Sequence, residues 1–197
     1  MHQDELATLI RWCDDGCGHF ELLLPMVGQT VAFTAIPADR SAPAVTERMA
    51  QTLRETLALG HDDLLKIEAL LWEECRFAFE TGDYGIDVRP EETRVDAHLR
   101  AFELAGPRDA LRKAQLLQVY IHDDSVSRFV CLETDTVSGN RICVIIKNGR
   151  IVDFDDSATL LNWFENEDRY AHKRRQVILS GNFVAASVEI GSFATTP

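Results

Sequence analysis

The stretch that decides the fold is RICVIIKNGRIVDF, residues 141–154. Two apolar runs flank its centre, Asn148-Gly149, which is the strongest short signal for a two-residue β-hairpin turn in the chain. Two more apolar runs precede it, at residues 116–121 and 128–134, with short polar links between them. Because short links favour antiparallel neighbours, residues 116–154 predict an antiparallel meander of four strands.

The N-terminal part predicts three more strands. Residues 7–12, 19–24 and 30–36 are apolar enough for strands, and Asp14-Asp15-Gly16 and Gly28 are turn signals between them. Leu6, Leu9 and Ile10 also fit a helical repeat, so a short helix over residues 4–12 is the alternative to the first strand.

Helical periodicity is strongest between residues 45 and 82. Apolar residues repeat every four positions from Val45 to Leu57, and Gly60 is a helix stop. A second helix begins with acids in its first turn, at His61-Asp62-Asp63, and ends at Gly82. A third helix is expected to open at Pro90 and to end before Gly106, and residues 108–113 are expected to add a further turn.

Strands, helices, strands, a helix and strands follow one another along the chain, which predicts an α+β fold. We expect an antiparallel sheet, formed by the N-terminal hairpin or meander and the C-terminal meander, packed against a layer of about three to four helices. Ser157 is expected to cap the last helix, and residues 176–179 and 183–190 to form a closing hairpin. A chain of 197 residues predicts a single α+β domain over residues 1–197, with residues 169–197 as a candidate C-terminal extension.

The charge is strongly negative. Asp and Glu number 32 and Lys and Arg 20, which gives a net charge of −12. The sign reverses only in residues 169–197, where Arg169, Lys173, Arg174 and Arg175 face Glu189 alone. A body this acidic repels phosphate backbones, which argues against a nucleic-acid partner, and attracts a cationic protein. A charge of this size can also serve solubility alone.

Cysteine usage and hydropathy bear on the compartment. The chain has five cysteines, an odd number, and its first five residues are acidic rather than a secretory signal. No apolar run approaches the roughly 18 to 20 residues that cross a bilayer. We therefore expect a cytoplasmic protein without a membrane partner. Cys75, Cys131 and Cys143 lie in apolar runs and are expected to be buried thiols.

The motif closest to a metal cluster is Cys13-x3-Cys17-x-His19. It could supply two thiolates and an imidazole to zinc, but a fourth ligand at matching spacing is missing. Its glycines and aspartates are also what a hairpin turn needs, so a turn flanked by thiols is the favoured interpretation. Whether Cys13, Cys17 and His19 bind a metal stays open.

Other motifs give no catalytic residue, metal site or cofactor. His-Asp-Asp occurs at residues 61–63 and 122–124, where metal ligation competes with a helix start and a strand end. Nucleophile elbows, phosphate loops and metalloprotease motifs are missing from the sequence, so an enzyme is not expected. Trp72 and Trp163 are expected in or near the core, and the basic residues 169–175 in a solvated loop.

Residues 18–156 carry a resemblance. The segment FELLLPMVG at 20–28, the helix pair through ALLW at 69–72, and the strand–turn–strand at 142–154 resemble an uncharacterised family of small acidic bacterial proteins. Relatives of that family are often immunity proteins of contact-dependent toxin systems. Such relatives usually carry an acidic tryptophan turn between the late strands, where this chain has TDTVSGN at 134–140. The resemblance implies a binding protein and carries over no catalytic residue.

The expected function is therefore an immunity-type protein that binds and neutralises a cognate, cationic toxin by occlusion. Two alternatives are a small metal-dependent hydrolase that uses the His61 and His122 clusters, and an interaction module without a toxin partner. The expected contacts are exposed acids at the ends of elements, namely Asp62, Asp63, Asp83, Asp123, Asp124, Asp155 and Asp156.

Overall fold

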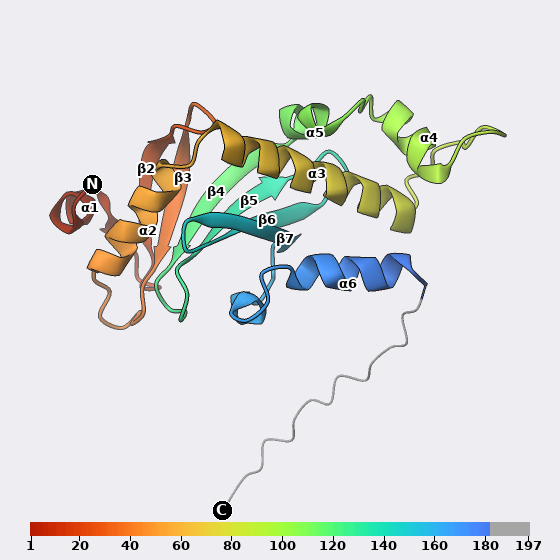
Figure 1. The fold of residues 1–197 in the computed structure, drawn as a ribbon. Helices are drawn as coiled ribbons and strands as arrows, with labels where there is room; N and C mark the ends of the chain where they lie inside the picture. Colours follow the sequence, from red (N-terminus) through yellow and green to blue (C-terminus); the bar gives the residue numbers. More distant parts are fainter. Residues whose placement is uncertain (182–197) are drawn as a thin grey trace, which may run out of the picture.

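The structure is a computed structural model that describes residues 1–181. Seven strands form one sheet, in which each strand lies beside its neighbour in sequence (Figure 1). All neighbouring pairs are antiparallel except β3 and β4, which are parallel. The strands are β1 Arg11–Trp12, β2 Gly18–Leu24, β3 Gln29–Ile36, β4 Gln115–His122, β5 Phe129–Asp135, β6 Arg141–Lys147 and β7 Arg150–Asp156.

The parallel pair exists because four helices separate β3 from β4 in the chain. A parallel neighbour needs a long crossover, and these helices supply it. Thr46 caps the first of them by accepting a hydrogen bond from the Met49 amide (3.0 Å), and Thr93 caps the third through the Asp96 amide (3.1 Å). The helices are α2 Glu47–Leu57, α3 His61–Thr81, α4 Arg94–Ala101 and α5 Pro107–Lys113.

The main core lies between this helical layer and one face of the sheet. Phe33, Val119 and Leu132 point from the central strands toward Leu53 of α2 and Leu71 of α3, and all five are buried. Burial of such side chains contributes about 1.5–3 kcal/mol each relative to exposure. None of the helices in residues 1–181 is long and apolar enough to span a membrane.

Within residues 1–181, the opposite face of the sheet is covered mainly over β5–β7. The 3₁₀ helix η1, Leu161–Phe164, and the start of α6, Tyr170–Leu179, place Phe164 and Ala171 on Phe129 and Ile145. Helix α6 then runs beside β7 and below α3 in the view of Figure 1. Over β2 the same face carries the exposed side chains His19 and Glu21. The part of this face over β2 therefore carries polar side chains together with the exposed Leu23.

A buried ionic cluster holds α6 in place. Arg175 donates to the Asp153 carboxylate (2.8 Å), to the Glu73 carboxylate (2.8 Å) and to the Phe154 carbonyl (2.7 Å). Asp153 also accepts from the His172 amide (2.8 Å), and the His172 ring contacts Glu73 Oε1 at 2.8 Å. Arg175 and Asp153 are both buried, so removing one of them would leave the other as an unpaired buried charge.

Glu73 makes this docking sensitive to acid. Burial on its own raises the pKa of Glu73, but hydrogen bonds and charge from Arg175 and His172 outweigh it, so the pKa lies below the ordinary 4.5. A lowered carboxyl pKa stabilises the fold above the unfolded value, and that contribution is lost as the pH falls through the folded value. The stability advantage of wild type over Glu73→Gln should therefore shrink once the pH drops below about 4.5. Urea unfolding of wild type and Glu73→Gln from neutral to acidic pH measures the difference in their free energies of unfolding. A difference that does not change with pH would contradict the prediction.

Most sequence expectations for the elements are confirmed. The α+β class, the helices through residues 45–82, the turn at 108–113 and the four late strands are present. Asn148 and Gly149 have φ of 49° and 74°, the left-handed pair that a tight hairpin turn requires. Cys75, Cys131 and Cys143 are buried as expected.

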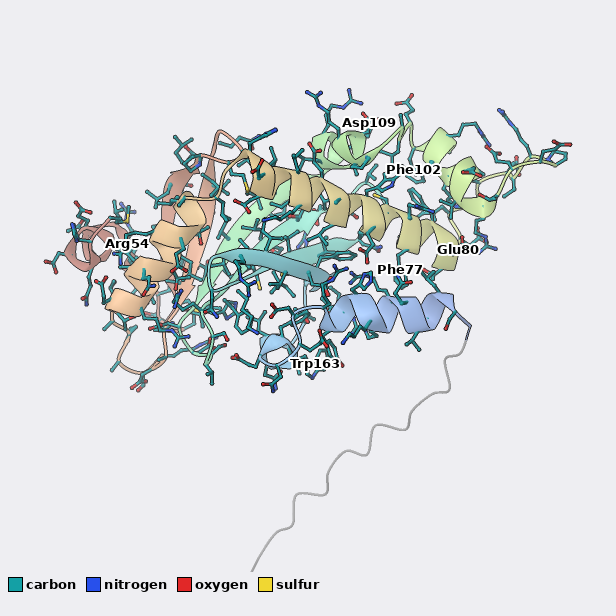
Figure 2. All side chains as sticks on the ribbon, in the orientation of Figure 1. Arg54, Phe77, Glu80, Phe102, Asp109 and Trp163 are labelled. Carbon is teal, nitrogen blue, oxygen red and sulfur yellow. The ribbon has the colours of Figure 1, made fainter. Side chains whose placement is uncertain are left out.

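Several expectations were wrong. Residues 3–9 form helix α1, Gln3–Leu9, so the alternative to the first strand holds for most of that segment. The helix expected directly after Ser157 is the short 3₁₀ helix η1, which begins at Leu161 and is not capped by Ser157, and residues 176–179 end helix α6 instead of starting a hairpin. Residues 183–190 lie outside the described residues. The basic residues 169–175 are not a solvated loop but mostly belong to α6, and Trp163 is 39% exposed, on the turn before α6 (Figure 2).

Candidate functional site

Three loops meet where the parallel strands β3 and β4 end. Ile36 pairs with His122 at these carboxyl ends, and Gly18 at the start of β2 pairs with Ala35. The loops over residues 13–17, 37–46 and 123–128 therefore share one end of the sheet, which we call the carboxyl edge. Ligand sites in sheets with parallel strands concentrate at such ends.

The loop over residues 13–17 is a tight, internally bonded turn. The Cys13 amide donates to the Cys17 carbonyl (2.9 Å), and the Gly16 amide donates to the Cys13 carbonyl (3.0 Å). Gly16 has φ of +76°, and a β-carbon there would lie 2.2 Å from the Arg40 carbonyl oxygen. Only glycine fits this position, because the turn packs directly on the second loop of the carboxyl edge.

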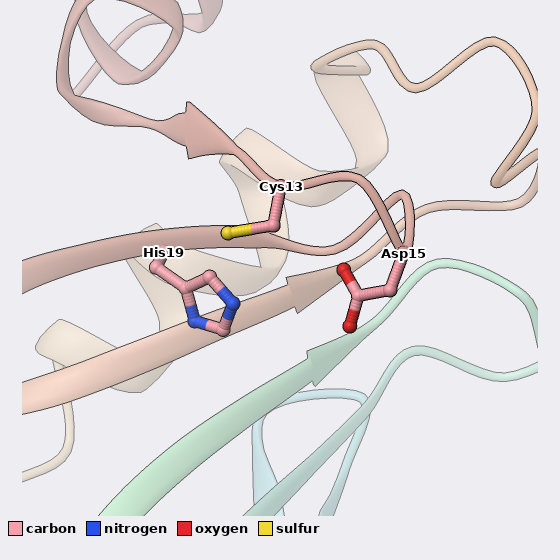
Figure 3. A group of neighbouring side chains, drawn as sticks. All are labelled: Cys13, Asp15 and His19. Carbon is pink, nitrogen blue, oxygen red and sulfur yellow. The ribbon is translucent and has the colours of Figure 1, made fainter.

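This turn brings Cys13, Asp15 and His19 together (Figure 3). One thiol, carboxylate or imidazole donor atom from each lies within 4.8 Å of the others, and all three residues are exposed. Cys17 instead points inward, is buried, and has a raised pKa because of that burial. The expected turn is therefore present, but Asp15 stands where the sequence pattern suggested Cys17 as a ligand.

A chain of polar side chains runs from His19 across the uncovered face of the sheet. His19 Nδ1 lies 3.0 Å from Thr34 Oγ1, which also accepts a short hydrogen bond from Gln118 Nε2. Gln118 Oε1 accepts from the Tyr120 hydroxyl (3.3 Å), which also lies 3.5 Å from Glu133 Oε2. Burial, followed by the charge of Glu133, raises the pKa of Tyr120. The Thr34 hydroxyl thus holds the His19 ring at Nδ1, and Gln118 and Tyr120 continue the chain of hydrogen bonds behind Thr34.

The third loop of the carboxyl edge holds Asp123 and Asp124 in different environments. Asp123 is only 7% exposed; it accepts from Thr46 Oγ1 (2.7 Å) and lies 3.2 Å from Arg48 Nε. Asp124 is exposed, and a hydrogen bond from His122, opposed in part by burial, lowers its pKa. The expectation of an exposed Asp123 was wrong, because this carboxylate is buried against Thr46 and pairs with the partly exposed Arg48 of α2.

The other expected contact residues lie apart from one another. Asp155 is also buried rather than exposed, since it binds Arg174 and accepts from Thr159 Oγ1 (2.8 Å). Asp62 and Asp63 begin α3, Asp83 follows its end, and Asp156 ends β7. The seven acids therefore do not form a single surface.

The two His-Asp-Asp segments do not meet either. His61 begins α3, and Leu64 and Ile67 of that helix line a cavity of about 550 Å³ with Met26, from the β2–β3 turn. That turn is at the end of the sheet opposite His122. Within residues 1–181, the clustered metal-ligand donors are those of Cys13, Asp15 and His19, and neither segment contributes to them.

The carboxyl edge itself is acidic and carries an apolar projection. Its three loops expose Asp14, Asp15, Asp39 and Asp124 against Arg40. Val126 is 87% exposed, yet its loop is held by Arg48, which donates to the carbonyls of residues 125–127 at 2.6–3.0 Å. Exposed acids and an exposed apolar residue therefore share this end of the sheet.

A second hollow lies between α3 and α6. It has a volume of about 470 Å³, and its walls include Phe77 and Glu80 of α3, labelled in Figure 2, and Leu179 of α6. Acidic and basic side chains, among them Glu73, Arg76 and Arg175, line it together. Because Arg175 already binds buried carboxylates, this hollow belongs to the docking of α6.

Comparison with known proteins assigns the chain to no family. No protein-family model, curated protein or solved structure matches it. The resemblance of residues 18–156 to acidic immunity-related proteins therefore stays a prediction, and the function rests on the geometry of the carboxyl edge.

Proposed function

We propose that this chain is an immunity-type protein of the bacterial cytoplasm that binds a cationic protein toxin and occludes it. The observation that carries the proposal is the carboxyl edge, where Asp14, Asp15, Asp39 and Asp124 are exposed at the same end of the sheet as the exposed Val126. The net charge of −12 supports it, because long-range attraction speeds the encounter with a basic partner.

The two features of the edge have different roles in binding. Exposed acids steer the partner and set the association rate, since their attraction reaches about 10 Å at 0.1 M salt. An apolar residue held on a rigid loop loses little conformational freedom on binding, so Val126 contributes mainly to a slow dissociation rate. Occlusion follows if this edge covers the toxin's own basic site.

Growth protection tests the proposal. The neighbouring gene that encodes a toxin domain is expressed in a bacterial host, alone or together with this protein. We expect arrest by the toxin alone and growth with both. Growth arrest that persists with every neighbouring toxin gene contradicts an immunity role. If this protein binds the product of a neighbouring gene and that product is not toxic, the result favours an interaction module over an immunity protein.

A matched pair of triple variants locates the surface. Asp14→Asn, Asp39→Asn and Asp124→Asn together should slow association with the toxin by about tenfold at low salt, because rim charges set the on-rate. The control carries Asp62→Asn, Asp83→Asn and Asp156→Asn, which change the net charge equally but lie elsewhere. Stopped-flow association at several salt concentrations measures both. Equal slowing in the two variants would show that total charge, rather than the carboxyl edge, attracts the partner.

A further inference from the structure

We propose that Cys13, Asp15 and His19 form a binding site for a zinc ion, with its fourth coordination position open to solvent. The inference goes beyond the proposed function and does not depend on it. Thiolate, carboxylate and imidazole are the three ligand types that zinc takes from proteins. Three protein ligands with one open position are characteristic of zinc sites that bind a further ligand or water.

The spacing of the three donors fits this ion after a small adjustment. Donor atoms about 2.0–2.3 Å from a tetrahedral zinc ion lie about 3.3–3.6 Å from one another. The donors of Cys13, Asp15 and His19 lie within 4.8 Å of one another, so they must close by roughly 1 Å. Exposed side chains make such a movement by small changes in side-chain torsions, and the backbone of the turn need not change.

Two of the proposed ligands, Asp15 and His19, are already oriented by hydrogen bonds to an atom that would not bind the ion. Asp15 Oδ1 accepts from the Cys17 amide (3.0 Å), which leaves Oδ2 for an ion. His19 Nδ1 lies 3.0 Å from Thr34 Oγ1, so an Nδ1–H donor to Thr34 leaves the Nε2 lone pair for the ion. Zinc-bound histidines are held in this way by a second partner, which fixes the tautomer and the ring plane.

Ligand chemistry favours zinc over the hard cations. A thiolate and an imidazole are poor ligands for magnesium or calcium, which take oxygen donors. Binding converts the Cys13 thiol to a thiolate with release of one proton, while Asp15 binds as a carboxylate and His19 as a neutral ring. A water molecule completes the tetrahedron, and the neighbouring acid Asp14 adds to the attraction for a cation.

Titration of the reduced, chelator-treated full chain with zinc chloride tests the site by calorimetry. We expect one equivalent to bind, and Cys13→Ser and His19→Gln each to weaken it by at least about tenfold. Thr34→Val, which removes the hydroxyl that contacts His19 and also accepts from Gln118, should weaken it by about tenfold through ring positioning. The controls are Cys17→Ser, which removes the buried thiol of the same turn, and Asp62→Asn, which matches the charge change of the ligand variant Asp15→Asn but lies at the start of α3; both controls should leave the zinc affinity unchanged.

Cobalt supplies a readout that a merely structural effect does not move. Cobalt chloride bound to the wild type should show a thiolate-to-metal charge-transfer band, which Cys13→Ser removes and Cys17→Ser retains. Zinc should also slow modification of Cys13 by a thiol reagent. The reaction reports on Cys13 because the other four cysteines are buried. Equal zinc affinity in wild type and Cys13→Ser, or a cobalt band that depends on Cys17, would overturn the proposal. Circular dichroism of each variant separates loss of the site from loss of the fold.

Discussion

Arg175→Met should lower the free energy of unfolding by about 3–5 kcal/mol, because it leaves the buried Asp153 carboxylate without its cation. The side chain lengths are similar, so the loss reports charge and hydrogen bonding more than packing. Arg175 also covers the ring of Phe154, with 3.6 Å between the guanidinium carbon and the ring centroid, and this contact is lost as well. Urea unfolding monitored by circular dichroism measures the change.

Arg169→Met is the matched control for this prediction. Arg169 lies 3.8 Å from the same Glu73 but is 46% exposed, so the same substitution should cost under about 1 kcal/mol. The double variant Arg175→Met with Asp153→Asn should recover part of the loss, because the unpaired charge is gone. A loss as small for Arg175→Met as for Arg169→Met would mean that α6 is held by apolar contacts rather than by the ionic cluster.

Local patterns predicted those parts of the fold that local physics decides. Asn148-Gly149 specifies a turn in which both residues take positive φ, so the late hairpin could be predicted without knowledge of its surroundings. Residues 4–12 fit both periods, and the observed helix α1 buries Leu6 and leaves the other side chains of the segment 3–9 outside the core. Residues 176–179 are apolar like a strand, but Arg175 and His172 tie the segment to α3 and β7 as a helix.

Sheet order and the burial of charges depend on partners far along the chain. The parallel contact of β3 with β4 follows from four intervening helices, and no pattern within either strand reveals it. Asp123 and Asp155 are buried because Arg48 of α2 and Arg174 of α6 reach them. In the same way, the left-handed turn at Gly16 directs Cys17 inward and Asp15 outward, which ligand spacing alone could not predict.

Arg48→Met should loosen the carboxyl edge and lower the free energy of unfolding by about 2–3 kcal/mol. Arg48 is the cation beside buried Asp123, and its own partial exposure places the loss below that of a fully buried pair. It also donates to three carbonyls of the loop that presents Val126, and these hydrogen bonds are lost in the variant. Amide exchange in residues 124–127 should therefore speed up more than the change in global stability explains.

Arg54→Met, on the same helix, tests whether the buried partner is the cause; Figure 2 labels this residue. Arg48 and Arg54 are 36% and 37% exposed, but Asp123 is 4% exposed at its side chain and Glu47, the partner of Arg54, is 63% exposed. The control should therefore lose under about 1 kcal/mol and leave exchange in the loop unchanged. Equal losses from the two arginines would contradict the assignment of Arg48 to the carboxyl edge. If the loop does loosen, dissociation of the proposed toxin partner should speed up, while association should stay the same if the exposed acids set it as proposed.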